Sequence, residues 1–257
     1  MARRSLGLKP GLRLFLHTAL VLTLTVLTQL GGLAWLIGLC FRRRVLAFVL
    51  SYAALSFAAL WVAPLTGRSA LPCHGSDLYQ MHSPLYCVMN RHYVAPELHQ
   101  AVAEFAAQME AAHPGTQTRI LDANFPFLTG FPLLPHLSHD DGAKVDLAFF
   151  YAEDSGYLPG KTRSPIGYFA FEDGPTQCPK TALSLRWDMG WLQPLWPRYT
   201  PDPARMTTAL ALLSADPRIT KIFIEPHLAQ RFQAQSPKIR FQGCRAARHD
   251  DHIHIQL

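Results

Sequence analysis

Two long uncharged stretches near the start of the sequence constrain the fold of this chain most. Residues 14–41 and residues 45–67 contain no Asp, Glu, Lys or Arg. A helix needs about 20 apolar residues to cross a bilayer, and each stretch is longer than that. Only Arg42, Arg43 and Arg44 separate them, which leaves room for a tight turn. Residues 1–68 are therefore predicted to form a two-helix transmembrane hairpin that anchors the protein to membrane lipid.

Other interpretations of these stretches explain less. A cleaved signal peptide is disfavoured because the first stretch is too long and a second follows at once. Two buried helices of a soluble protein are the remaining alternative.

The sequence gives conflicting indications of how the hairpin is oriented. A two-helix hairpin would place both of its ends on one side of the membrane. Five basic residues flank it and three form its turn, which slightly favours cytoplasmic ends. The four cysteines that follow the hairpin indicate the opposite, because an even set suits disulfides in an oxidising compartment. Cys73–Cys87 and Cys178–Cys244 are the expected pairs, as neighbours within each half of the domain.

The basic charge of the chain is concentrated in the anchor. Eight of the 24 Lys and Arg residues precede the first acidic residue, Asp77, which leaves 16 against 18 Asp and Glu in the rest. The net charge of +6 therefore reflects the anchor and gives no indication of nucleic-acid binding.

Residues 69–257 are long enough for one domain with its own core. Apolar residues at helical spacing predict a helix over 96–112, and Asp202-Pro203 is typical of a helix start, here running to about residue 215. Strands are predicted at 118–123, 144–151, 219–225, near 239 and at 252–257. Helices and strands follow one another without a regular rhythm, so an α+β fold is expected.

Histidines are concentrated in the segment "HDDHIHI", residues 249–255. Its alternation predicts a strand with Ile253 and Ile255 directed into a core and His252 and His254 on the opposite face. Two neighbouring imidazoles are a common way to present metal ligands. A solvated strand face is the alternative.

A second cluster lies in "PHLSHDDGAKVDLAFFY", residues 135–151. Asp146 belongs to an apolar strand, where a carboxylate needs a partner. His139 precedes it by seven residues, and Gly142 is available for the turn between them. With one histidine from residues 249–255 the set becomes His, Asp and His, which is typical of a catalytic zinc site. Alternatively, Asp146 pairs with Lys144 or an arginine.

The two clusters resemble the zinc motifs of the LAS metallopeptidases, the group that includes lysostaphin, the D-Ala-D-Ala peptidases and Sonic hedgehog. His139 and Asp146 match the His-x6-Asp motif, and His252-x-His254 matches the His-x-His motif. His136, His249, "RWDMGW" at 186–191 and "DPRITKIFIEPHL" at 216–228 are similar to the penicillin-insensitive murein endopeptidases. The resemblance covers about residues 121–257. His249 stands where the carboxy- and dipeptidases of the group have a catalytic glutamate.

This resemblance implies an LAS-like antiparallel sheet with flanking helices and a zinc ion held by His139, Asp146 and His254. His252 is then the first choice for the general base or transition-state stabiliser, and His249 is the second. His136 is expected to contact substrate or to orient a ligand. Trp187 is expected to support the fold rather than to act in catalysis.

The resemblance also implies a function and a location. The expected function is zinc-dependent hydrolysis of amide bonds in peptidoglycan cross-link or stem peptides. Such a substrate places the domain of residues 69–257 in the periplasm, anchored to the bacterial inner membrane, with a cytoplasmic domain as the alternative. The competing functions are a non-catalytic LAS-fold module that binds metal or peptidoglycan, and a metallopeptidase with a non-murein substrate.

Overall fold

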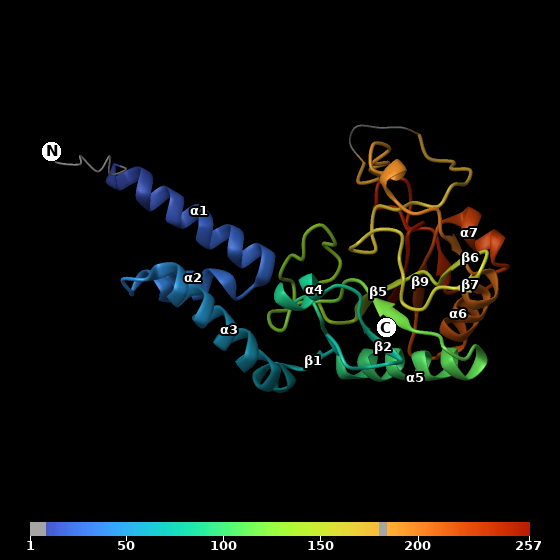
Figure 1. Ribbon diagram of the computed structural model, residues 1–257, viewed down its shortest axis with the longest axis horizontal. Coiled ribbons are helices and arrows are strands. Elements are labelled where there is room, and N and C mark those ends of the chain that lie inside the picture. The colour runs from blue at the N-terminus through green and yellow to red at the C-terminus, as the bar shows by residue number, and fades with distance from the viewer. Residues whose placement is uncertain (1–8, 180–183) are drawn as a thin grey trace.

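The computed structural model describes residues 9–179 and 184–257, which form a helical anchor and a globular α+β region (Figure 1). The mixed α+β class expected from the sequence is confirmed. The anchor contains α1 (Pro10–Thr28), α2 (Gly31–Leu39), α3 (Arg44–Val62) and the short 3-10 helix η1 (Ala63–Thr66).

Two of the anchor helices are long and apolar enough to cross a membrane. These are α1 and the continuous segment Arg44–Thr66, which has 23 residues, and only 6% of either apolar window is buried. A core helix of a soluble protein would be mostly buried, so the exposure of both helices favours a lipid environment. The alternative that these stretches are two buried helices of a soluble protein therefore disagrees with their exposure in the structure.

The connection between the two long helices differs from a simple hairpin. The first uncharged stretch is broken at Gln29, whose φ of 63° ends α1, and α2 then returns along it. A Cβ atom on Gly32 would overlap the Thr25 hydroxyl, so glycine is what allows this close return. Trp35 of α2 bonds His17 of α1 at 3.3 Å and its ring contacts Phe48 of α3.

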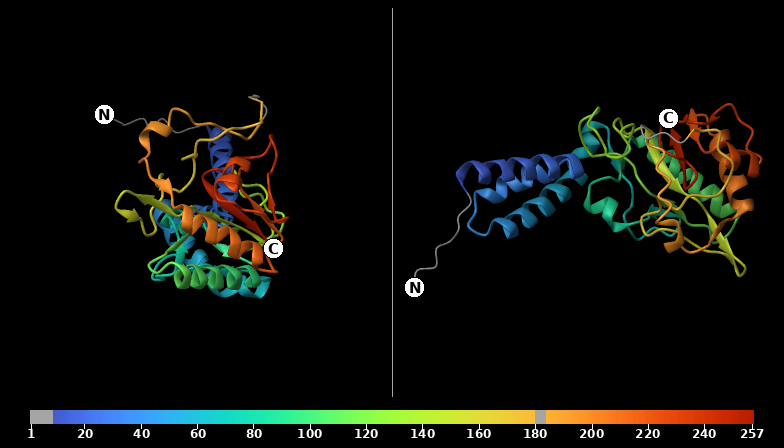
Figure 2. Two further views of the ribbon diagram at one scale, coloured as in Figure 1. Left: turned by 90° about the vertical axis from the view of Figure 1, so that its right-hand side faces the viewer. Right: turned by 90° about the horizontal axis from the view of Figure 1, so that it is seen from above.

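Helix α2 therefore runs antiparallel to both α1 and α3. Helices α1 and α3 consequently point in the same direction (Figure 2). The start of α1 and the turn at Arg42–Arg44 lie toward the end away from the globular region (Figure 1). The start of α1 and the end of α3 therefore lie at opposite ends of the helical anchor (Figure 1), because α2 adds one reversal of direction that the simple hairpin lacks.

The globular region is built around a six-stranded sheet in the order β10-β9-β11-β5-β4-β2. Its strands are β2 (Tyr79–Met81), β4 (Thr118–Ile120), β5 (Lys144–Ala148), β9 (Lys221–Phe223), β10 (Ile239–Arg240) and β11 (His252–Gln256). The four central strands are antiparallel, as expected, whereas β10 pairs with β9 and β2 pairs with β4 in parallel. Helices lie between the strands of each parallel pair, and such a crossover permits a parallel arrangement.

The remaining elements surround this sheet. The other helices are α4 (Pro84–Val88), α5 (Pro96–Ala112), α6 (Pro203–Ala215), α7 (Pro226–Arg231) and the 3-10 helix η2 (Gln193–Leu195). Two smaller sheets contain β1 (Ser69–Ala70) with β3 (Tyr93–Val94), and β7 (Gly156–Tyr157), β6 (Tyr151–Glu153) and β8 (Thr200–Pro201). The predicted strand 144–151 is thus two strands, because the chain leaves the large sheet after Ala148 and enters another at Tyr151.

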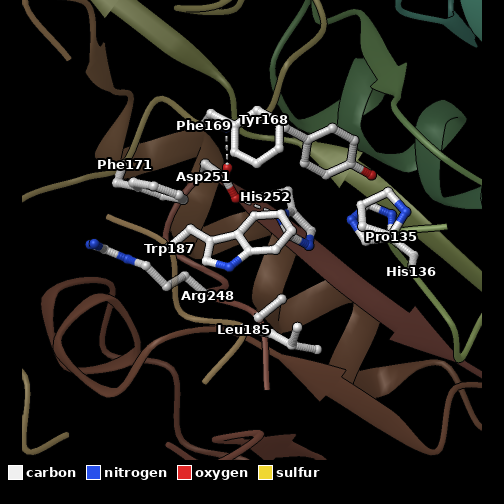
Figure 3. Close-up of a pocket in the computed structure, with 11 residues that line it drawn as sticks. Pro135, His136, Tyr168, Phe169, Phe171, Leu185, Trp187, Arg248, Asp251 and His252 are labelled. Carbon is white, nitrogen blue, oxygen red and sulfur yellow. Dashed lines mark hydrogen bonds and ion pairs between the residues drawn. The ribbon is translucent and has the colours of Figure 1, made fainter. Parts of the chain in front are cut away.

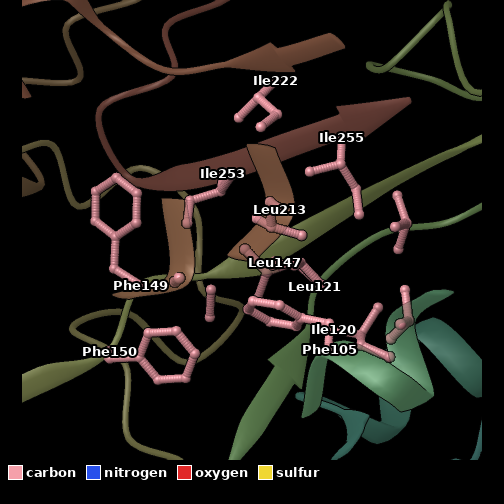
Figure 4. Packing of buried hydrophobic residues seen from close by; sticks show 14 of the residues in the cluster. Phe105, Ile120, Leu121, Leu147, Phe149, Phe150, Leu213, Ile222, Ile253 and Ile255 are labelled. Atoms are coloured by element: carbon pink, nitrogen blue, oxygen red, sulfur yellow. The ribbon is translucent and has the colours of Figure 1, made fainter. Parts of the chain in front are cut away.

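The hydrophobic core lies on one face of the large sheet. Phe105 of α5 and Leu213 of α6 pack against Leu147, Ile253 and Ile255 of the sheet (Figure 4). The alternation of β5 and β11 directs their polar side chains to the opposite face. That face is also covered, since His252, His254 and Asp146 are all at most 3% exposed, so the alternative of a solvated strand face is wrong.

Both expected disulfides are confirmed. Cys73 is bonded to Cys87 at the end of α4, and Cys178 is bonded to Cys244. Cys40 in the anchor is the free cysteine and is exposed.

Candidate metal centre

Two neighbouring strands bring the histidine and aspartate motifs together. His254 on β11 stands directly opposite Asp146 on β5 in the antiparallel pairing. His139 comes from the loop before β5 and reaches the same point because the chain turns at Gly142, whose φ is +86°. A Cβ atom at Gly142 would also strike the Arg68 guanidinium, so the predicted role of this glycine in the turn has a clear physical reason.

The donor atoms of these side chains are within hydrogen-bond distance of one another. Asp146 Oδ1 lies 2.7 Å from His254 Nδ1 and 3.4 Å from His139 Nε2, and the two histidine nitrogens are 3.1 Å apart. The alternative pairing of Asp146 with Lys144 is wrong, since the Lys144 ammonium bonds Asp141 instead.

His136, His139 and Asp146 form a group that can hold a metal ion, with donor atoms all within 4.8 Å. His136 approaches Asp146 from the other carboxylate oxygen, with Nδ1 3.4 Å from Oδ2. The same His136 nitrogen makes a shorter bond, 2.9 Å, to Asp122, so His136 is shared between two carboxylates. His254, by contrast, contacts both His139 and Asp146 directly.

The separations between the donors can be compared with those around a tetrahedral cation. Zinc bonds to histidine nitrogen and carboxylate oxygen are about 2.0–2.2 Å, which places tetrahedral ligands about 3.3–3.6 Å apart. The 3.4 Å separation of His139 and Asp146 lies in this range, whereas the separations of 3.1 and 2.7 Å to His254 are shorter and would have to widen around an ion. Two imidazole nitrogens and one carboxylate oxygen are also a donor set that zinc prefers.

Hydrogen bonds on the outer sides of the two histidines orient their rings. His139 Nδ1 donates to the Ala123 carbonyl at 2.9 Å, which leaves Nε2 with a lone pair toward Asp146. The Gln256 side-chain amide lies 3.0 Å from His254 Nε2, and its oxygen can accept the Nε2 proton when the amide is turned. Both rings can therefore present an unprotonated nitrogen to a shared cation.

The charge states follow from burial and from mutual attraction. Burial alone would raise the pKa of Asp146, but His139 and His252 lower it well below its usual range, so Asp146 stays a carboxylate. Burial lowers the pKa of His254 to about 4 against the opposing effect of Asp146. Burial also opposes charge on His139, but the Asp146 carboxylate leaves its pKa raised, so a bound cation would have to displace the His139 Nε2 proton. A carboxylate and a neutral imidazole are the forms that bind a cation.

His252 lies beside the donor group and is held by its own carboxylate. Its Nδ1 donates to Asp251 Oδ1 at 2.5 Å, and its Nε2 lies 3.7 Å from Asp146 Oδ1. Burial disfavours the charged ring, but Asp146 and Asp251 together raise the pKa of His252 to about 9. Asp251 is in turn fixed by the Phe169 backbone N–H, which donates to Oδ2 at 2.6 Å.

His249 is buried beside His252 and His254 but makes a different set of contacts. Its ring centroid is 4.8 Å from that of His252 and 5.6 Å from that of His254. Among the described residues no side chain or backbone group bonds its Nδ1. Burial, followed by the nearby histidines, places the pKa of His249 well below its usual value, so the ring is neutral.

His136 belongs to a carboxylate network that sequence reasoning missed. Arg91 makes a bidentate ion pair with Asp122, and Asp122 accepts a hydrogen bond from His136 Nδ1. Burial would raise the pKa of Asp122, but Arg91 and His136 bring it to about 2. Tyr168 is a second omission, since its hydroxyl donates to Asp146 Oδ2 at 2.6 Å. Asp122 and Tyr168 do not lie in either sequence motif, and only the folded chain places them at the cluster.

Two adjoining cavities open onto the cluster. The first contains the histidines and Asp146, and the second has an apolar wall of Phe169, Phe171, Leu185 and Trp187 (Figure 3). His136 and His252 line both cavities. Trp187, predicted to support the fold, is 46% exposed and lines the second cavity.

No described protein family matches this chain, and no curated protein matches it.

Proposed function

We propose that the chain is a membrane-anchored zinc peptidase that hydrolyses amide bonds in peptidoglycan cross-link or stem peptides. The observation that carries the proposal is the convergence of His139, Asp146 and His254 from two sequence-distant motifs, with donor atoms 2.7–3.4 Å apart. The antiparallel strands at the centre of the sheet and the helices on its other face support an LAS-like arrangement.

The zinc ion would be held by His139 Nε2, Asp146 Oδ1 and His254 Nδ1. Its binding would displace the proton that His254 Nδ1 shares with Asp146. Bound there, the ion would supply Lewis-acid polarisation of the amide carbonyl and would make water a stronger nucleophile. Tyr168 and His136 hold the second oxygen of Asp146, so they fix which oxygen is presented to the cation.

His252 would move the proton in the reaction. Because its Nδ1–H is committed to Asp251, its Nε2 is the atom that faces the cluster. The raised pKa of His252, about 9, keeps its ring protonated near neutral pH, so Nε2–H would donate to the negative charge that develops on the amide oxygen. The same nitrogen can give its proton to the leaving amine. His249, neutral and with Nδ1 unpaired among the described groups, would contact the attacking water or the substrate amide.

A second candidate function is supported by the apolar cavity beside the cluster. Phe169, Phe171 and Trp187 form a surface that suits an apolar or aromatic side chain better than the small and acidic residues of a stem peptide. This observation favours a metallopeptidase with a non-murein substrate at the same metal centre.

Digestion of cross-linked peptidoglycan fragments by the full-length protein with zinc tests the proposal. We expect mass spectrometry to show cleavage of a cross-link or stem amide bond, and we expect Asp146→Asn to be inactive. His74→Ala, which removes an imidazole outside the cluster, is the matched control and should remain active. Cleavage of apolar peptides without cleavage of murein would support the second candidate. Binding of murein without any cleavage would support the non-catalytic module.

The charge distribution of the anchor supports a periplasmic domain. Lys9 and Arg13 begin α1, and Arg42–Arg44 lie toward the same end, whereas Arg68 lies at the end near the globular region. Basic residues near membrane spans favour the cytoplasm, so this arrangement favours export of the globular region. The reversal at Gln29 thus removes the conflict between charge and cysteines, because the two disulfides also suit an oxidising compartment.

Reporter fusions test this orientation. We expect alkaline phosphatase fused after Leu257 to be active, and a fluorescent protein that matures only in the cytosol to be bright when fused before Met1. Opposite sides for the two fusions would agree with the three-helix anchor. A dark N-terminal fusion together with an active C-terminal one would support the simple hairpin, and an inactive phosphatase would place the metal centre in the cytoplasm.

A further inference from the structure

The arginine turn and the length of α3 set the depth of the anchor in a bilayer. Three consecutive arginines cannot lie in the hydrocarbon, so Arg42–Arg44 mark one boundary of the apolar layer. The 23 residues of Arg44–Thr66 extend about 34 Å at 1.5 Å per residue, against an apolar thickness of about 30 Å. The opposite boundary therefore lies near Leu65. The side chains on this part of the helix are exposed: Leu65 by 84%, Trp61 by 71% and Phe57 by 63%.

The globular region is attached to α3 well below that boundary. Tyr52 donates its hydroxyl to the Val88 carbonyl at 2.5 Å, and Asn90 bonds Tyr52 and Ser56 at 3.0 and 3.1 Å. Tyr52 precedes Thr66 by 14 residues, which is about 21 Å along the helix. This distance is much longer than a tyrosine side chain, so the end of α4 lies at the depth of the apolar layer.

The Gln29 side chain and the Asn90 Nδ2 amide are paired within the protein at this level, whereas Asn90 Oδ1 has no partner among the described residues. The Gln29 side chain bonds both the N–H and the carbonyl of Phe127, at 2.9 and 2.7 Å. The Asn90 amide also contacts the Thr28 carbonyl at the end of α1. Pairing of this kind is what a hydrocarbon environment requires, because no water is available there. The outward side chains are apolar in contrast, with Leu85, Val88 and Leu128 at 48%, 62% and 67% exposure.

We propose that α4 and the loop of residues 125–137, together called the membrane base, are immersed in the lipid leaflet on the side of the globular region. The same loop continues into the site, where Pro135, His136 and Leu137 line the cavity that contains the histidines. The metal centre consequently opens beside the lipid surface and takes peptides presented there. This last step depends on the proposed peptidase function, whereas the immersion does not.

Spin-label accessibility in nanodiscs tests the immersion without measuring activity. Labels are placed by Leu85→Cys and Leu128→Cys in a Cys40→Ser background, with Leu195→Cys, 66% exposed in η2, as the matched control. We expect oxygen, which concentrates in lipid, to relax the labels at 85 and 128 more than a water-soluble nickel chelate does. At position 195 we expect the nickel chelate to relax the label more than oxygen does. Water-like accessibility at 85 and 128 would overturn the proposal, and peptide mapping would verify that both disulfides are retained.

Cleavage kinetics test where the substrate is taken from. The same peptide is offered free and with an acyl anchor, to wild-type protein in vesicles and to Leu128→Asp. We expect a higher kcat/KM for the anchored form, and we expect Leu128→Asp to lose this advantage while it still cleaves the free peptide. Equal rates on both peptides would contradict a surface-presented substrate. Failure to cleave either one would count against the peptidase function, and the accessibility result would still decide the immersion.

Discussion

Alanine at His139, Asp146 or His254 is expected to abolish stoichiometric zinc binding by the full-length protein. Three protein ligands leave no redundancy, since loss of one leaves two donors and an enlarged cavity. Removal of a residue that only orients a ligand typically costs about 10–100-fold in metal affinity, and the loss here should exceed that. Metal analysis after dialysis against a weak chelator, together with isothermal titration, provides the measurement.

The control for this experiment distinguishes the two possible donor sets. His136→Ala should keep zinc with reduced affinity, because His136 donates to Asp122 and contacts only the outer oxygen of Asp146. If His136→Ala loses the metal while His254→Ala retains it, the ligands are His136, His139 and Asp146 instead. Asp146→Asn is a second variant at the central position, because it keeps the shape of a buried side chain that Tyr168 and His254 contact. Circular dichroism would establish that each variant is folded.

His252→Ala should retain zinc and lose turnover. Its Nε2 lies 3.7 Å from Asp146 Oδ1, so under the proposed function it would act on a proton rather than as a metal ligand. Loss of a general acid–base group typically reduces the rate by about 10²–10⁴-fold, and this effect should fall on kcat. Measurement of kcat and KM at full zinc occupancy separates the loss of proton transfer from a loss of binding.

Two further variants define the surroundings of His252. Asp251→Asn should reduce kcat less than His252→Ala does, because it removes a positioning group, and it should also change the pH profile of kcat. His249→Ala tests the alternative base, and a larger loss of kcat there than in His252→Ala would exchange the two roles. Loss of zinc in His252→Ala with retention in His254→Ala would mean that His252 is the ligand.

Local patterns predicted the parts of the structure that depend on local physics. The helix at Pro96–Ala112 has the predicted bounds, and Asp202 caps α6 by accepting from the Arg205 N–H as its sequence indicates. The alternation in β11 correctly separated Ile253 and Ile255 from His252 and His254. These features depend on neighbours in sequence, which a single chain displays directly.

The parts that were missed depend on contacts between distant residues. The direct opposition of Asp146 and His254 is a matter of strand register, which a pattern with period two cannot specify. Asp122 and Tyr168 reach the cluster from segments without a motif. The reversal at Gln29 had a local signal, since polar residues and Gly31-Gly32 interrupt the apolar stretch, but glycines are also tolerated within membrane helices.

The position of β11 between β5 and β9 has a consequence for when the protein acquires activity. Asp146 and His254 are 108 residues apart, and pairing them requires closure of a long loop that carries an entropic cost. A chain that is still being threaded through a membrane, or that has folded only as far as β5, has just two of the three proposed donors. Under the proposed function, hydrolytic competence would therefore arise only once β11 has paired with β5, and an incompletely folded chain would be inactive. Zinc uptake would in turn serve as a direct readout of completed folding.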